Sequence, residues 1–204
     1  DAHLSLDGWY SCHSCHTDGH TTGHNNDNLS DSSFGAPKRI LPLGGVGQTG
    51  PWAWDANSKN LTRQIHSSIL NTMQGTERTD AELAALETYL KTLKPAPSLD
   101  RMRGTVNTEA VNRGQLVFKT QGCADCHQPP TFTSPATYDV SLSDELGGKE
   151  FNPPSLLGVS QRQELFHDGR AKSLKDVLEK FQHGDAHQLT EQQRADLIKF
   201  LRSL

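Results

Sequence analysis

The sequence predicts an all-α, loop-rich protein made of two similar units. Each half of the chain ends in a stretch whose apolar residues recur at the three- and four-residue spacing of one helix face. The first stretch follows a candidate helix cap at Thr79 or Asp80 and stops before Pro95, and the second follows a cap at Thr190. The same five-residue cysteine motif lies near the start of each half. We therefore expect a duplicated helical unit.

A change in composition separates the two expected units. Prolines and small residues gather between 94 and 107, where Pro95, Pro97 and Gly104 disfavour regular structure. The expected boundaries are an N-terminal unit at 1–97, a linker at 98–107 and a C-terminal unit at 108–204.

The composition excludes several classes of protein. Only 33% of the 204 residues are hydrophobic, and no apolar run is long enough to cross a membrane. The 20 basic and 24 acidic side chains give a net charge of −4 without a basic cluster, so nucleic acid is not an expected partner. The low apolar content predicts a thin core, which a large non-protein group could complete.

The cysteine pattern identifies that group. All four cysteines fall in two C-x-x-C-H motifs. At this spacing both thiols can bond the two vinyl groups of one haem while the following histidine reaches the iron. The sequence therefore predicts two covalently attached c-type haems, held by Cys12, Cys15, His16, Cys123, Cys126 and His127. Such attachment takes place outside the cytoplasm, so we expect a periplasmic or otherwise exported protein.

Two other uses of the cysteine pairs fit less well. One zinc ion held by both pairs would leave the two following histidines unexplained, and structural zinc pairs lie much closer in sequence. Two redox-active disulfides would need a thioredoxin-like βαβ context, which the sequence lacks.

Several separated segments resemble one family. The stretch 108–120, with Gly114 and Phe118 one turn apart, resembles the first helix of cytochromes c, in which a glycine lets this helix cross the last one closely. Residues 151–157 and 165–170 look like the C-terminal haem domain of bacterial dihaem cytochrome c peroxidases. Trp54, Asp55 and residues 61–64 resemble a segment of the N-terminal domain of the same family.

This resemblance implies an architecture and a role for one tryptophan. The architecture is two cytochrome c-like haem domains with the haems near a shared interface, which methylamine-utilisation dihaem enzymes share. Trp54 stands at the place of a tryptophan that relays electrons between the haems. Packing against a porphyrin is the simpler role for the same side chain.

The sixth ligand of each iron decides the expected function, because an iron with six ligands is closed to substrate. In the first half, Met73 is the best-placed sulfur ligand, whereas Met102 lies in the expected linker. Weaker alternatives in this half are His20, His24 and His66.

The second half differs from the dihaem peroxidases at the position of their methionine ligand. Phe181 stands where the peroxidases usually carry a methionine ligand, and its side chain cannot bind iron. We expect His183 to serve instead, with His187 as the next candidate.

The resemblance also bears on proton transfer. The segment 73–75 stands where the peroxidases carry a glutamate that assists O–O cleavage, and its thioether and amide cannot replace that acid. Glu77 could substitute through a local shift, and Gln64 is a candidate member of the distal pocket.

Two arginines are candidates for haem propionates. Arg39 and Arg170 could pair with these carboxylates, although plain exposure to solvent explains them equally well. The interdomain calcium of the family is doubtful here, because Arg162 and Glu164 replace the threonine and proline of the peroxidases.

Two functions therefore compete. One is a dihaem c-type cytochrome that passes electrons between its haems and to a redox partner, which is a small protein or a fused domain. The other is an enzyme, a cytochrome c peroxidase that reduces hydrogen peroxide with electrons from a small donor protein. The missing glutamate and the Met73 ligand favour electron transfer, and they predict a higher potential at the first haem.

Overall fold

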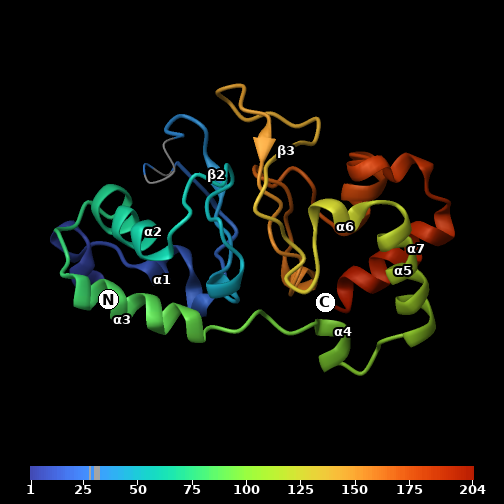
Figure 1. Ribbon diagram of the computed structural model, residues 1–204, viewed down its shortest axis with the longest axis horizontal. Coiled ribbons are helices and arrows are strands. Elements are labelled where there is room, and N and C mark those ends of the chain that lie inside the picture. Colours follow the sequence, from blue (N-terminus) through green and yellow to red (C-terminus); the bar gives the residue numbers. More distant parts are fainter. Residues whose placement is uncertain (28, 30–32) are drawn as a thin grey trace. The chain divides into compact units, whose positions relative to one another are not determined.

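The computed structural model describes residues 1–27, 29 and 33–204, which fold into two compact units. The first unit contains residues 1–95 and 135–152, and the second contains residues 96–134 and 153–204. The segment 135–152 thus belongs to the first unit although it follows the second cysteine motif in sequence. Figure 1 shows the course of the chain through each unit.

The first unit consists of short helices and two small antiparallel sheets. Its α-helices are α1 (Cys12–Cys15), α2 (Leu61–Ser67), which continues into a π-helical turn (Ser68–Thr72), and α3 (Asp80–Thr92). It also contains 3₁₀ turns at Ala2–Leu4, Leu6–Gly8, Thr17–Gly19 and Val46–Gln48. Strand β1 (Asn25–Asn26) pairs with β2 (Lys38–Arg39), and β3 (Tyr138–Asp139) pairs with β4 (Glu150–Phe151). The expected helical class is confirmed as a helix-rich fold, but these two-residue strands show that it is not all-α. They are too short to produce an alternating pattern in the sequence.

The core of the first unit forms where α2 meets α3, which Figure 1 shows side by side. Thr79 caps α3 as expected, because its side chain accepts from the backbone N–H of Glu82, whose carboxylate binds the backbone N–H of Thr79 in return. The buried residues of this core are Val46, Leu61, Ile65, Ile69 and Leu83. Few large side chains contribute, in agreement with the low apolar content of the chain.

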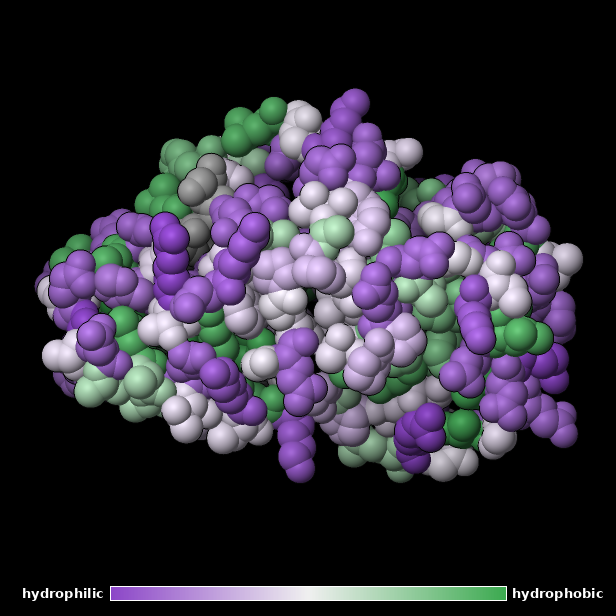
Figure 2. All heavy atoms as spheres, viewed as in Figure 1, coloured by the Kyte–Doolittle hydropathy of each residue, from purple (hydrophilic) through white to green (hydrophobic). Residues whose placement is uncertain are grey.

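The second unit is a more regular helical assembly. Its helices are α4 (Leu99–Met102), α5 (Thr108–Thr120), α6 (Cys123–Cys126), a π-helical turn (Asp176–Lys180), a 3₁₀ segment (His183–Gln188) and α7 (Glu191–Arg202). Helix α4 lies within the stretch 98–107, where Ser98 caps it. Among the described residues no helix is long and apolar enough to cross a membrane. Hydrophilic residues cover much of the face seen in Figure 2, with apolar residues between them.

The crossing of α5 and α7 depends on a glycine, as the sequence indicated. A Cβ atom on Gly114 would lie 2.0 Å from the backbone oxygen of Asp196, so no larger residue fits without separating the helices. Beside the crossing, the rings of Phe118 and Phe200 lie 5.2 Å apart between centres. Arg113 binds the buried Asp196 carboxylate with two hydrogen bonds across the same contact.

Matching turns show that the two units repeat one plan. In each of the segments 52–58 and 165–171 the first and last residues form an isolated β-bridge. The second residue of each segment has a positive φ, 69° at Ala53 and 70° at Phe166. Trp54 and His167 therefore occupy the same place in the two turns, and both are buried.

Candidate functional site

The second cysteine motif forms one helical turn that ends at a half-buried histidine. His127 closes α6, and its backbone N–H donates to the carbonyl of Cys123 at 3.0 Å. The Nδ1–H of its ring donates to the backbone oxygen of Phe132 at 3.1 Å. This hydrogen bond holds the proton on Nδ1, so the lone pair of Nε2 is available to a metal. Burial lowers the pKa of His127 to about 4, which keeps the imidazole neutral at neutral pH.

A second imidazole lies close to this ring. The ring centres of His127 and His183 are 6.4 Å apart. Two imidazoles bonded to opposite sides of one metal, each at about 2 Å, have ring centres about 6 Å apart. Burial also lowers the pKa of His183, so this ring is neutral too. The residues present therefore fit one iron held between the two rings.

Local backbone and aromatic packing place His183. Gln182 has a φ of 50°, which turns the chain just after the π-helical turn. The ring of Phe166 packs edge-on against His183 at 5.5 Å and against Phe181 at 5.3 Å. The alternative candidate, His187, is exposed on the 3₁₀ segment.

The first cysteine motif has the same backbone hydrogen bond, but Nδ1 of its histidine, His16, has no partner among the described residues. The backbone N–H of His16 donates to the carbonyl of Cys12 at 2.8 Å, as at the end of α6. Burial lowers the pKa of His16, and backbone groups of His20 and Leu41 only partly oppose this shift. Tyr10 lies beside the motif, and its hydroxyl contacts the sulfur of Cys15. Burial and this sulfur raise the pKa of Tyr10.

Met73 is buried in the first unit, with only 3% of its surface exposed. It directly follows the π-helical turn Ser68–Thr72, just as Phe181 directly follows the turn Asp176–Lys180. Its backbone oxygen accepts from the N–H of Leu6 at 3.0 Å. In contrast, the alternative sulfur ligand Met102 lies in the second unit and is 68% exposed.

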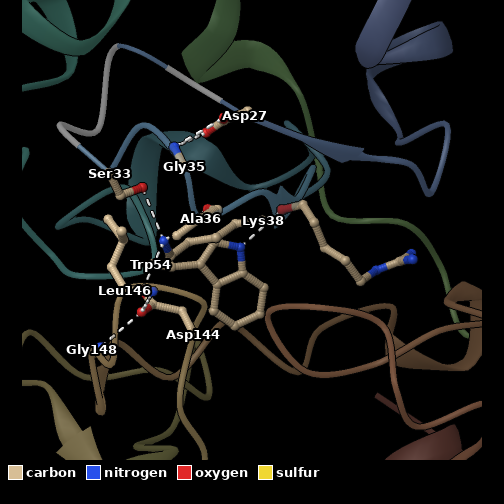
Figure 3. A network of polar contacts seen from close by, with 10 residues as sticks. Asp27, Ser33, Gly35, Ala36, Lys38, Trp54, Asp144, Leu146 and Gly148 are labelled. Atoms are coloured by element: carbon tan, nitrogen blue, oxygen red, sulfur yellow. Dashed lines mark hydrogen bonds and ion pairs between the residues drawn. The ribbon is translucent and has the colours of Figure 1, made fainter.

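Trp54 lies in a polar network that the sequence did not reveal, shown in Figure 3. Its Nε1–H donates to the backbone oxygen of Arg39 at 2.8 Å. The neighbouring Lys38 is buried, and its amino group forms an ion pair with Asp144 at 3.2 Å. This pair joins segment 135–152 to the rest of the first unit, where Asn152 also donates from its N–H to the oxygen of Trp54. This ion pair could not be predicted from the sequence, because Lys38 and Asp144 are more than a hundred residues apart.

The structure places the remaining predicted side chains in polar contacts of their own. The guanidinium of Arg39 donates to the oxygen of Gly23 at 2.6 Å, and Arg170 pairs with Asp168 at 2.5 Å. Gln64 donates from its amide to the hydroxyl of Ser68 at 3.4 Å.

The carboxylate of Glu77, the alternative proton donor, is mostly exposed. It binds Nε2 of His66 at 2.6 Å. Both side chains of this pair belong to the first unit.

Disulfides and a shared metal are the two other uses of the four cysteines. None of the four cysteines forms a disulfide in the described part of the chain. No cluster of three or more histidine, cysteine or acidic side chains suited to a metal occurs in that part of the chain.

Comparison with known proteins defines the class. Residues 111–204 match the family model of cytochrome c, so the second half of the chain contains a cytochrome c domain. A domain of this class carries a covalently bound c-type haem with its iron. The second C-x-x-C-H motif, from Cys123 to His127, lies within the matched residues.

The resemblance to dihaem peroxidase-like proteins is confirmed along the whole chain. The chain is 26% identical over its full length, and over 74% of the relative, to hydrazine synthase subunit gamma of Kuenenia stuttgartiensis. It is 24% identical over its full length, and over 75% of the relative, to the methylamine utilization protein MauG of Methylorubrum extorquens.

Solved structures have the same fold. A structure of hydrazine synthase from Kuenenia stuttgartiensis under xenon pressure matches the whole chain and 84% of its own chain, with a TM-score of 0.81 and 25% identity. A MauG-like protein associated with microbial copper homeostasis matches the whole chain and 84% of its own, with a TM-score of 0.71 and 19% identity. The chain is therefore a cytochrome c-type haem protein related to MauG and to hydrazine synthase subunit gamma.

Proposed function

We propose that the chain is an exported dihaem c-type cytochrome that transfers electrons between its two haems and to a redox partner protein. The observation that carries this proposal is the 6.4 Å separation of the His127 and His183 rings. His127 and His183 would then both hold one iron, so that the chain itself would supply both imidazoles. An iron closed in this way exchanges electrons without binding a substrate.

The two units would hold their irons differently. His127 and His183 provide two neutral imidazoles in the second unit, which burial maintains. In the first unit His16 and the buried Met73 provide an imidazole and a thioether. Bound haem supplies a centre that accepts and releases one electron, and the protein sets its potential through these ligands. Trp54, whose indole is fixed by the Arg39 carbonyl, is our candidate for a relay between the haems.

Peroxide reduction is the second candidate, supported by the relationship to MauG. It requires an iron with an open position and a nearby acid that protonates the leaving oxygen. Glu77 is 76% exposed and is paired with His66, so it is poorly suited to such a role. We therefore place electron transfer first.

Spectroscopy of the oxidised and half-reduced protein tests this choice. We expect two low-spin, six-coordinate signals by electron paramagnetic resonance in the oxidised protein, and no high-spin signal after addition of one electron. A high-spin, five-coordinate signal in the half-reduced protein would contradict the proposal and support the peroxidase.

A further inference from the structure

An exposed aromatic pair leads from the surface to the first cysteine motif. Trp9 is 65% exposed, and its ring stacks on Tyr10 with 4.9 Å between centres and 29° between planes. Tyr10 is half-buried, and its hydroxyl contacts the sulfur of Cys15. Two aromatic rings therefore join solvent to a sulfur atom that covalently holds the haem in a c-type cytochrome.

The position of this pair is fixed by the backbone that precedes the motif. The N–H of Tyr10 donates to the hydroxyl of Ser5 at 3.1 Å, and Ser5 is buried. The next residue, Leu6, donates from its N–H to the carbonyl of Met73. Tyr10 is thus held against Cys15 by contacts that do not involve the Trp9 ring. Trp9 is not among the buried residues of the core of the first unit.

The second unit has no equivalent of this pair. Thr120 and Gln121 stand at the same two positions before the second motif, and both are exposed. Since neither side chain is aromatic, this motif has no aromatic connection to solvent through these positions. The asymmetry indicates that the two haem sites differ in their access to an external electron donor or acceptor.

We propose that Trp9 and Tyr10 form the port through which the first haem site exchanges electrons with another redox protein. This inference rests on the proposed function, because it needs a haem bound at Cys12, Cys15 and His16. One electron passes from a reduced partner, which is oxidised by one unit, to the iron, which is reduced from ferric to ferrous. Trp9 and Tyr10 act as a bridge for tunnelling, so neither ring is itself oxidised and no bond forms or breaks.

The test uses the full haem-loaded protein and measures the rate at which photoreduced flavodoxin reduces each haem. Flavodoxin is too large to reach a buried centre directly, and a high salt concentration suppresses charge steering. We expect Trp9→Ala to slow reduction of the first haem several-fold, and Trp9→Phe to retain most of the rate because it keeps an aromatic ring. The control is Leu116→Ala, which removes an apolar side chain on α5 that is 62% exposed and should leave the rate unchanged.

Two further readouts separate the bridge from an indirect effect on the haem. The visible spectrum and the reduction potential of the first haem should be the same in Trp9→Ala and in the parent protein. Near-ultraviolet circular dichroism should lose the signal of the stacked rings in Trp9→Ala and in Tyr10→Leu. Tyr10→Leu should also slow the reduction of the first haem by flavodoxin. It provides a second variant in case Trp9→Ala does not fold.

The outcomes distinguish this inference from the proposed function. If both haems are low-spin and the first haem is reduced as fast in Trp9→Ala as in the parent protein, the proposed role of Trp9 and Tyr10 is wrong. The electron-transfer function then stands. If reduction of the first haem is as slow in Trp9→Phe as in Trp9→Ala, an aromatic ring is not sufficient at this position. The proposed aromatic bridge is then also wrong. If the first haem is absent or high-spin, the proposed function itself fails.

Discussion

Gly75 and His183 occupy the same position, three residues past the end of the π-helical turn in their respective units. The residues between have matching backbones, with φ of 51° at Gln74 and 50° at Gln182. A Cβ atom on Gly75 would lie 2.1 Å from the carbonyl oxygen of Leu4, so the first unit has no room for a side chain there. The N-terminal segment therefore excludes a histidine from this position in the first unit. Met73 is left as the proposed ligand on this turn.

The first prediction concerns His183. Replacement by alanine removes one of two imidazoles whose centres lie 6.4 Å apart, so the second iron should become high-spin in the oxidised protein. Electron paramagnetic resonance detects this change. His187→Ala is the matched control, since that ring is exposed, and it should leave the spectrum low-spin. A high-spin signal in His187→Ala, with none in His183→Ala, would show that His187 and not His183 is the ligand.

The second prediction concerns Met73. Leucine has nearly the same volume, so Met73→Leu should change stability by less than about 1.5 kcal/mol while removing the thioether. We expect loss of the weak far-red band that a sulfur ligand gives, and a lower potential at the first haem. The control is Met102→Leu, because the side chain of Met102 is 68% exposed. A band that survives in Met73→Leu and disappears in Met102→Leu would move the ligand to Met102.

The third prediction concerns the crossing of α5 and α7. Gly114→Ala would place a methyl group 2.0 Å from the Asp196 oxygen, so the helices must separate. We expect the free energy of unfolding to fall by about 3 kcal/mol, at the upper end of the usual cost of overpacking. Urea unfolding measures this loss. Leu116→Ala on the exposed side of α5 should cost much less, and an equal loss in both variants would contradict the role of the close contact.

The fourth prediction concerns the ion pair of Lys38 and Asp144, whose side chains are 7% and 9% exposed. Lys38→Met leaves a buried carboxylate without its cation and should cost about 3 kcal/mol of stability. The double variant Lys38→Met with Asp144→Leu should recover most of this loss. Lys91→Met is the control, because its pair with Glu87 is on the surface and should matter little. An unchanged stability in Lys38→Met would show that the pair does not hold segment 135–152.

The same pair predicts a pH dependence. Hydrogen bonds from the Gly148 backbone and from Lys38 lower the pKa of Asp144 despite its burial, which acts in the opposite direction. A depressed pKa in the folded state adds stability above the unfolded pKa and loses it as pH falls through the folded value. The parent protein should therefore lose stability below about pH 4, and the double variant should lose less over the same range. Urea unfolding at several pH values provides the comparison.

Local signals in the sequence were sufficient to predict much of the fold. Thr79 and Thr190 mark helix starts through side-chain caps, and Gly114 marks a close helix crossing. The helix caps depend on residues a few positions apart. The crossing depends on glycine alone, because glycine has no Cβ atom. The short strands and the Lys38–Asp144 pair could not be predicted in this way, because they depend on where a distant segment packs. The separation of the His127 and His183 rings likewise required the three-dimensional structure.

The last prediction is the order of the two reduction potentials. Methionine stabilises ferrous iron better than a second imidazole does, so the first haem, with His16 and Met73, should have the higher potential. Electrons added to the protein would then rest on the first haem, where the described residues place Glu77 in an exposed pair with His66. Without a well-placed acid, reaction with peroxide should be slow. A potentiometric titration with both haems assigned, followed by stopped-flow mixing of the half-reduced protein with hydrogen peroxide, measures both quantities. A higher potential at the C-terminal haem would show that the ligand assignment is wrong, and fast, saturable peroxide reduction would replace electron transfer by a peroxidase function.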